Sequence, residues 1–253
     1  MPGVVRASAA LLLLLTLAQP STADCCRRYV RDVKSLAGAP LHWDRRAWTR
    51  FAEGTAAVAA IYVIDRKTFD AVQRNRSAFS DDFADAVTPF GGSRAWKVSL
   101  VMLVAGAATH HENLRAAGRD SLEAELWAAG VVTPLLKRTF GRARPFQEEG
   151  SASFHPFDHR FQSFPSGHAT TAFAAATAIA SHYDDWVVPT IVYTIASGVA
   201  ISRVNDRVHF PSDVLAGALI GRAVAKGVVA RHGRWIATPI VTDRAIGVVI
   251  TRR

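Results

Sequence analysis

The chain has 253 residues, a formal net charge of +9 and 49% hydrophobic residues, which excludes a disordered protein and allows one large helical domain or two small ones. The basic charge suits anionic partners such as phosphate esters or lipid headgroups, whereas the lack of zinc-finger spacing and of a basic-aromatic pattern excludes nucleic acid. Only two cysteines occur, the adjacent Cys25 and Cys26, so no disulfide framework holds the fold.

The N-terminus has the pattern of a secretory signal. Arg6 precedes an apolar segment from Ala9 to Ala18, and the small residues Ser21-Thr22-Ala23 follow. An apolar core of about ten residues is shorter than the roughly 20 that a spanning helix needs. We therefore expect residues 1–23 to be a cleaved signal peptide, with an uncleaved anchor as the alternative.

Residues 24–92 are expected to form an N-terminal helical segment packed on the core. The segment contains an apolar run from Phe51 to Ile64, which is short for a membrane span. The charged stretch from Asp65 to Asp82 is typical of a surface helix or loop. Proline and glycine residues then predict a loop over residues 87–93.

A helical core is expected over residues 93–231. Its first helix is predicted over Arg94–Thr109. Asp120-Ser121, followed by another acidic residue, is typical of the first turn of the next helix, which Pro134 should kink. This second helix should end close to Lys137, before a glycine.

The polar stretch from Gln147 to Gln162 predicts a long loop that covers the mouth of a site. His155 and His159 lie in this loop and allow two interpretations. A metal site is one, and surface histidines in an aromatic-rich loop are the other, which we favour.

Three more helices and a hairpin complete the prediction. Apolar helical runs predict the helices over Ser166–His182, Trp186–Ser202 and Ser212–Arg231. The tail over residues 232–253 is rich in Ile and Val and is split by Thr242-Asp243-Arg244, which predicts a short β-hairpin. The expected fold class is therefore all-α, with a small C-terminal hairpin.

A histidine and a carboxylate are placed to interact near the start of the last helix. His209 and Asp213 are four residues apart, and Pro211 between them suits the first turn of a helix. A carboxylate that contacts one ring nitrogen fixes the tautomer of a histidine and leaves the other nitrogen free to act as a nucleophile or base. Alone, such a pair is also common as a structural feature of helix starts.

Groups suited to binding phosphate occur in three separate segments. Lys137, Arg144 and Arg203 supply cations, and an arginine can form paired hydrogen bonds to phosphate oxygens. Ser166 and Gly167 begin a predicted helix, where free N–H groups and the helix dipole favour an anion. Alone, the basic residues around Lys137 would be interpreted as a solvated helix end.

Together, three segments resemble the signature of the type 2 phosphatidic acid phosphatase family, whose superfamily includes bacterial class A acid phosphatases and vanadium haloperoxidases. The segments are Lys137 with Arg144-Pro145, then Pro165-Ser166-Gly167-His168, then Ser202-Arg203 with His209 and Asp213. All signature positions are filled, and the resemblance covers residues 95 to about 230. The resemblance implies a helical bundle of this type, with residues 93–231 as its catalytic core.

The resemblance also implies a metal-independent phosphatase without a cofactor. In such an enzyme His209 is the nucleophile that forms a phosphohistidine, Asp213 holds it, and His168 is the general acid and then the base. Lys137, Arg144, Ser166, Gly167 and Arg203 form the phosphate cradle. Arg138, Arg142 and Arg207 fall outside the signature and are expected at the surface or the rim, and Asp206 receives no role.

Two other functions remain open at this point. A vanadate-dependent haloperoxidase uses the same cradle, and a phosphate- or lipid-binding protein without activity uses the same scaffold. The substrate class implied by the resemblance is a phosphorylated lipid or a small phosphate ester, and the sequence does not distinguish them. It does not indicate the oligomeric state either.

The location follows from the signal and from the short, alanine-rich apolar runs. We expect an exported protein, periplasmic or membrane-associated, that possesses a helical core and rests on a membrane surface. The alternative is an integral membrane protein with its active site on the outer face, since Glu53, Arg222 and Lys226 make insertion costly without excluding it.

Overall fold

A computed structural model of the chain describes residues 38, 43–232, 235–242 and 245–252. The expected signal peptide over residues 1–23, together with Cys25 and Cys26, lies outside the described residues. The chain divides into two compact units, Met1–Ala52 and Glu53–Arg253. The divisions expected after residues 92 and 231 remain predictions.

The described elements are mostly helices, which confirms the predicted all-α class. They are α3 (Arg45–Arg74), α4 (Ala78–Val87), the 3-10 turn η2 (Thr88–Gly91), α5 (Ser93–Ala108), α6 (Glu112–Glu125), the π-helical segment η3 (Leu126–Val132), α7 (Thr133–Phe140), the 3-10 turn η4 (Pro145–Gln147), α8 (Gly167–Ala180), α9 (Val187–Asn205) and α10 (Pro211–His232). Strands β1 (Trp235–Thr242) and β2 (Ala245–Arg252) pair antiparallel, with Trp235 opposite Arg252.

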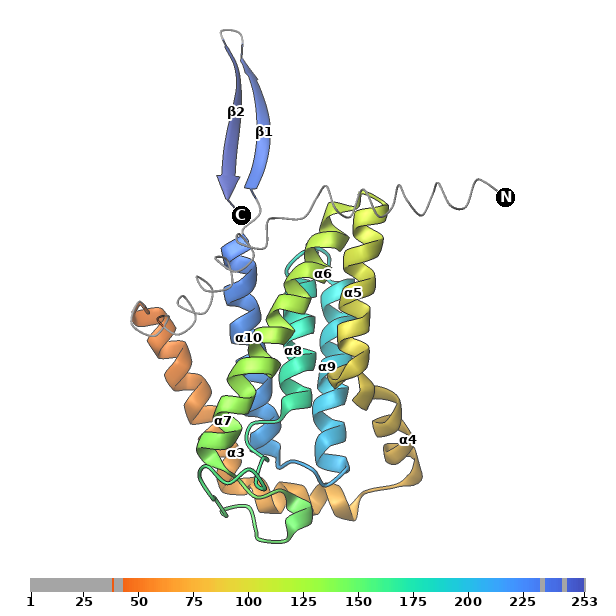
Figure 1. Cartoon of the computed structure of the whole chain (residues 1–253), viewed down its shortest axis with the longest axis vertical. Coiled ribbons are helices and arrows are strands. Elements are labelled where there is room, and N and C mark those ends of the chain that lie inside the picture. The colour runs from red at the N-terminus through yellow and green to blue at the C-terminus, as the bar shows by residue number, and fades with distance from the viewer. Residues whose placement is uncertain (1–37, 39–42, 233–234, 243–244, 253) are drawn as a thin grey trace, which may run out of the picture. The chain divides into compact units, whose positions relative to one another are not determined.

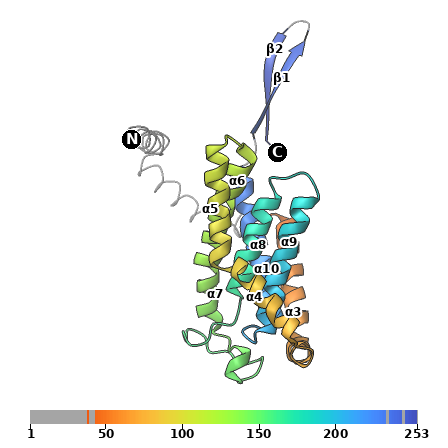
Figure 2. The ribbon, with the colours of Figure 1, turned by 90° about the vertical axis from the view of Figure 1, so that its right-hand side faces the viewer.

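Helix α8 lies at the centre of the bundle, packed against α6, α9 and α10 (Figures 1 and 2). Because α8, α9 and α10 follow one another with short connections, they run alternately up and down. The start of α8, the end of α9 and the start of α10 therefore lie at the same end of the bundle, where α7 also ends (Figure 1). The predicted extents of α8, α9 and α10 are confirmed within a few residues.

Two glycines allow α10 to lie directly against the backbone of α8. A Cβ atom added to Gly217 would lie 2.5 Å from the carbonyl oxygen of Ser166, and one added to Gly221 would lie 2.3 Å from that of Thr170. Such distances are far below van der Waals contact, so only glycine fits at these two positions. The first turns of α8 and α10 are thereby held side by side.

Helix α5 buries its small residues and exposes its large ones. Ala95, Ser99 and Gly106 are buried, whereas the side chains of Leu100 and Val101 are 52% and 65% exposed. Small residues let two helix backbones approach closely, as they do in membrane proteins. Helix α5 contacts α6 through the face that carries its small residues, and its outer face is apolar.

The start of α6 differs from the prediction. The helix begins at Glu112, and the ring of His111 caps it by accepting a hydrogen bond from the N–H of Leu114 at 3.4 Å. Asp120, expected in the first turn, lies in the middle of the helix with no exposed surface. It bonds to His182 at 2.9 Å and to His232 at 2.8 Å, so its carboxylate joins α6 to the ends of α8 and α10 rather than starting a helix.

The kink predicted at Pro134 stays a prediction, but regular α-helical bonding is lost close to this residue, since the π-helical segment η3 lies between α6 and α7 and ends two residues before it. Proline lacks an N–H and its ring clashes with the preceding turn, which disrupts regular α-helical bonding.

Among the described helices, α9 alone is long and apolar enough to cross a membrane, with a mean hydropathy of 1.5 over an 18-residue window. One third of that window is buried, and the core helix of a soluble protein can meet the same criterion. The finding concerns length and composition only.

Substitution of Gly221 by alanine tests the contact between α8 and α10. We expect G221A to lower the free energy of unfolding by about 1–3 kcal/mol, because the added methyl group forces the two helices apart. Denaturant unfolding measures the change. The matched control is G227A in the same helix, where nothing lies within 4 Å of the added atom. G227A should stabilise by about 0.5–1 kcal/mol through helix propensity, and equal effects of the two substitutions would contradict the close packing.

Candidate active site

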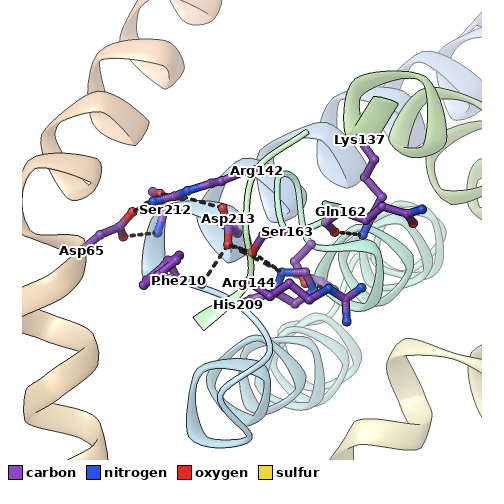
Figure 3. Close-up of polar contacts among 12 residues, drawn as sticks. Asp65, Lys137, Arg142, Arg144, Gln162, Ser163, His209, Phe210, Ser212 and Asp213 are labelled. Carbon is purple, nitrogen blue, oxygen red and sulfur yellow. Dashed lines mark hydrogen bonds and ion pairs between the residues drawn. The ribbon is translucent and has the colours of Figure 1, made fainter. Parts of the chain in front are cut away.

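His209 and Asp213 lie close together where α9 turns into α10. The loop between the helices carries His209, and the first turn of α10 carries Asp213 (Figure 3). The Nδ1 atom of His209 lies 3.6 Å from Oδ2 of Asp213, which is an ion-pair distance and longer than a hydrogen bond. Because Nδ1 faces the carboxylate, Nε2 is the nitrogen left free. The predicted contact is therefore present.

The Asp213 carboxylate has no exposed surface and is held by several donors. Its Oδ2 atom accepts hydrogen bonds from the hydroxyl of Ser163 at 2.6 Å and from the N–H of Phe210 at 2.8 Å. Its Oδ1 atom accepts from Arg142 at 2.6 Å. Burial alone would raise the pKa of Asp213, yet His209, Arg142 and Ser163 together hold it below its ordinary value.

The start of α8 lies beside Lys137. Ser166 is the N-cap, and its hydroxyl accepts a long bond of 3.5 Å from the N–H of Ala169. A Cβ atom added to Gly167 would lie 3.9 Å from Cε of Lys137. The Lys137 ammonium donates to the carbonyl oxygen of Gln162 at 2.6 Å, which directs it toward the helix start (Figure 3). This end of α8 therefore combines free N–H groups with a fixed cation.

Arg203 is held at the end of α9. Its guanidinium donates to the hydroxyl of Thr88 at 3.0 Å and pairs with Asp206 at 3.1 Å. Its Nε atom is buried and has no partner among the described residues. An unpartnered N–H in a buried cation is a donor available to a ligand. Asp206, to which the sequence assigned no role, thus orients one of the expected cradle residues.

Arg144 follows α7 in the segment before η4. Its N–H group donates to the side chain of Gln147 at 2.7 Å, and its guanidinium lies 5.8 Å from the ring centre of Phe146. The neighbouring backbone pairs with the long loop, because the N–H of Ala143 donates to the carbonyl of Ser153 at 3.0 Å. The loop over residues 147–162 therefore supports the segment that carries Arg144.

His168 lies in the first turn of α8, against the turn η2. A Cβ atom added to Gly91 would lie 2.8 Å from the Cβ of His168, so glycine is needed for this approach. Burial lowers the pKa of His168 to about 4, and the charges of Arg203, Lys137 and Arg144 act in the same direction.

The same cations also act on His209. Burial lowers the pKa of His209 to about 4, against the opposing effect of Asp213, and the charges of Lys137 and Arg144 contribute to the lowering. Burial and the charge of Arg144 lower the pKa of Lys137 to about 8. Lys137 and Arg144 act on both imidazoles, so His168 and His209 lie near the same positive charges. The catalytic roles expected for these residues stay predictions.

Arg142 corrects a prediction, because it was expected at the surface and has no exposed surface at all. It lies behind Asp213 and contacts Asp65, a residue that was expected in a surface stretch and is also fully buried. Thr88 and Ser163 were not singled out from the sequence either. None of these four carries a motif, and their partners are distant in the chain, so local spacing gave no signal.

The side chain of His155 in the long loop contacts other residues of the same loop. His155 bonds to Glu149 at 2.7 Å and stacks on Phe161 with 3.9 Å between ring centres. In the described part of the chain, no group of three or more His, Cys, Asp or Glu side chains is arranged to hold a metal ion.

The arrangement can bind an anion and act on it. Three cations and a helix start converge from separate segments, and each imidazole offers a neutral nitrogen. Such a site suits a tetrahedral oxyanion, whose charge spreads over several oxygens.

Comparisons with known proteins agree with this geometry. A family model described as the PAP2 superfamily matches residues 124–237, the stretch that contains all three motif segments. A lipid A 1-phosphatase of Rhizobium etli is 35% identical over 162 residues, which cover 58% of this chain and 68% of that protein. A lipid A 1-phosphatase of Rhizobium johnstonii is 43% identical over 97 residues, covering 37% of this chain and 39% of that protein.

A similar arrangement of helices occurs in a solved structure. The transmembrane PAP2 type phosphatidylglycerolphosphate phosphatase of Bacillus subtilis superposes with a TM-score of 0.54 at 25% identity. The match covers 72% of this chain and 91% of that one.

Titration of the histidine rings by NMR tests the electrostatics of the site. We expect His168 and His209 to be neutral above about pH 5 in the free protein, because both pKa values lie near 4. Inorganic phosphate should raise the pKa of His168, since its negative charge offsets the neighbouring cations. Chloride at equal ionic strength is the control, and a pKa that phosphate leaves unchanged would contradict the shared anion site.

Proposed function

The chain belongs to the PAP2 superfamily and is a phosphatase, and we propose that it hydrolyses lipid phosphates through a phosphohistidine intermediate without a metal ion. One observation carries the proposal. The buried His209 faces Asp213 with Nδ1 at 3.6 Å, and burial and the charges of Lys137 and Arg144 lower its pKa to about 4, which favours the neutral ring. A nucleophile needs a neutral imidazole with a free lone pair, and this arrangement provides both.

In the first step Nε2 of His209 attacks phosphorus, and the bond from phosphorus to the leaving oxygen breaks. Asp213 stabilises the positive charge that develops on the ring. His168 donates a proton to the leaving oxygen. In the second step neutral His168 takes a proton from water, the water oxygen attacks the phosphohistidine, and His209 is released.

The cradle stabilises the charge on the transferred phosphoryl group. Lys137, Arg144 and Arg203 offer cations, and the N–H groups at Gly167 and His168 offer dipoles. Loss of one such donor typically costs about 2.7–4 kcal/mol of transition-state stabilisation. These contributions supply the charge that a metal ion provides in other phosphatases.

A lipid substrate fits the outer surface of the bundle. Leu100, Val101 and Val104 of α5 are all more than half exposed, and so are Ile191 and Ile201 of α9. Large exposed apolar surfaces mark contacts with a membrane or a partner. Together with the small residues inside α5, they support a membrane-associated enzyme that receives its substrate from lipid. The named relatives from Rhizobium act on lipid A, and we extend only the lipid phosphate class to this chain.

The N-terminal signal pattern supports export, so we propose that the site lies on the outer side of the membrane. The proposal includes small water-soluble phosphate esters as second substrates, because the residues of the cradle bind the phosphate group and not an acyl chain.

Phosphate release from an aryl phosphate and from a short-chain phosphatidic acid tests the mechanism. We expect H209A to lose activity by more than about 1,000-fold, because the nucleophile is absent, while excess chelator leaves the wild type unchanged. H168A should retain more activity on the aryl phosphate, whose leaving group needs no proton, than on the lipid. The control is H159A in the exposed loop. Activity of H209A equal to wild type, or inhibition by chelator, would contradict the mechanism.

Carbonate extraction of native membranes tests the location. We expect the wild type to remain with the membranes and the double variant V101E/V104E to shift toward the soluble fraction. A charge placed among lipid chains costs roughly 2.5–3.5 kcal/mol at the centre of a membrane. The control is K67E, in the exposed and charged part of α3. Full release of the wild type by carbonate would show that it is not embedded, and equal behaviour of both variants would show that α5 does not face lipid.

A further inference from the structure

Arg142 is a buried cation that lies between two buried carboxylates. Its Nη1 atom donates to Oδ1 of Asp213 at 2.6 Å, and its Nη2 atom donates to Oδ2 of Asp65 at 2.7 Å. All three side chains have no exposed surface. Figure 3 shows Arg142 between Asp65 and Asp213, with His209 on the other side of Asp213.

The guanidinium has no free N–H group. Besides the two carboxylates, it donates to the hydroxyl of Ser212 at 2.8 Å and twice to the carbonyl oxygen of Ser151, at 3.0 and 2.6 Å. These contacts use all five N–H groups that an arginine possesses. Arg142 therefore has a fixed position and orientation, and it cannot bind phosphate without losing a partner.

The bond from Arg142 decides which oxygen of Asp213 faces the histidine. Oδ1 is turned toward Arg142, and Oδ2 is left with Ser163, Phe210 and the ring of His209. Rotation of the carboxylate would break bonds at both oxygens. The position of Asp213, and through it the orientation of the His209 ring, depends on Arg142.

Asp65 fixes Arg142 and the start of α10 at the same time. Its Oδ1 atom accepts from the N–H of Ser212 at 2.8 Å, and its Oδ2 atom accepts from the hydroxyl of Ser212. The carboxylate thus caps the helix that carries Asp213, although it belongs to α3, 147 residues earlier in the chain. Burial raises the pKa of Asp65, and the bonds from Ser212 and Arg142 offset part of that effect.

Aromatic rings exclude water from the guanidinium. Its central carbon lies 5.0, 5.6 and 4.6 Å from the ring centres of Tyr62, Phe154 and Phe210. Burying three charges costs several kcal/mol each before their attraction is counted, and apolar side chains can often replace such a group without loss of stability. A function in orientation accounts for the buried charges better than stability does.

We propose that Asp65 and Arg142 are positioning residues of the phosphatase, which act through Asp213 to orient His209. The proposal rests on the proposed function, because it assigns His209 the reacting nitrogen. Neither residue touches the substrate. Asp65 links α3 to the reaction, so a segment outside the family motifs takes part in setting the rate.

The test compares conservative variants with matched controls that lie close by in the chain. D65N keeps the size of the side chain and removes its charge, and its control is D70N, one turn later in α3, where the aspartate pairs with the exposed Arg66. R142K keeps the positive charge but lacks the planar guanidinium with its five N–H groups. Its control is R138K at the exposed end of α7. All are assayed as the full chain with an aryl phosphate.

We expect kcat of D65N and R142K to fall by about 10- to 100-fold, the range seen for residues that orient the ligands of a catalytic metal. The inhibition constant of inorganic phosphate should change less than about threefold, because Lys137, Arg144 and Arg203 remain in place. The two controls should match the wild type.

A third variant, R142M, is tested by the pH dependence of kcat/KM, which would not change if Arg142 served only the stability of the fold. Asp213 faces His209, Lys137, Arg144 and, through Arg142, Asp65. Without the guanidinium, burial should raise the pKa of Asp213, so the acidic limb of kcat/KM should move to higher pH. R142K, which keeps the charge, should leave that limb in place.

The outcomes separate the two proposals. If H209A stays active, the proposed function fails. If H209A is inactive while D65N and R142K match their controls in kcat, only the positioning proposal fails. A lower melting temperature with unchanged kcat per folded protein would also overturn it, since Asp65 and Arg142 would then serve stability alone. If R142M does not fold, D65N and R142K decide the question.

Discussion

The buried carboxylate of Asp213 constrains the site more than any other group, because a charge without exposed surface must have its oxygens satisfied. Its partners come from three separate places: Arg142 after α7, Ser163 before α8, and His209 with Phe210 before α10. The main-chain carbonyl of Asp213 also accepts a bond from the N–H of Ser166 at 2.9 Å. Satisfying one carboxylate therefore brings together the segments that carry the histidines and the cations.

This convergence requires helices that approach closely. Gly217 and Gly221 allow the backbones of α8 and α10 to touch, and Gly106 and Gly118 do the same for α5 and α6, where added Cβ atoms would lie 2.3 Å from main-chain nitrogens of the facing helix. Small residues inside leave the large apolar side chains of α5 outside. The same packing that aligns the helix starts thus produces an apolar outer face, so the geometry of the site and the proposed association with lipid have a common cause.

The sequence predicts what depends on local spacing. The extents of α5, α8, α9 and α10 follow from periodicity, and the contact between His209 and Asp213 follows from four residues across a helix start. Long-range partners were missed. Asp120 was expected in the first turn of a helix because acidic residues are common there. Its carboxylate instead forms hydrogen bonds with His182 and His232, which lie 62 and 112 residues away in the chain.

Arg142 and Asp65 show the same limit in the site itself. A sequence gives the charges of both residues but not the fold that brings α3 behind the loop after α7, so each was expected at the surface. Burial changes what a charged residue does. An exposed arginine is a solvated charge, whereas a buried arginine must be paired and therefore fixes the positions of its partners.

The electrostatics of the site link binding to chemistry. In the free protein burial, together with the charges of Arg203, Lys137 and Arg144, lowers the pKa of His168, since a fourth positive charge in the same buried cluster would be costly. A phosphate dianion offsets two of these charges, and the proton on His168 then becomes favourable. Binding of the anion and protonation of the acid are therefore one coupled equilibrium. His209 differs from His168 in its neighbours. Asp213 favours the charged form of His209 even in the free protein, although burial outweighs this effect, and in the proposed mechanism it stabilises the charge on that ring once the phosphoryl group is attached. The opposite tasks proposed for two histidines with similar pKa values therefore follow from their neighbours rather than from the rings themselves.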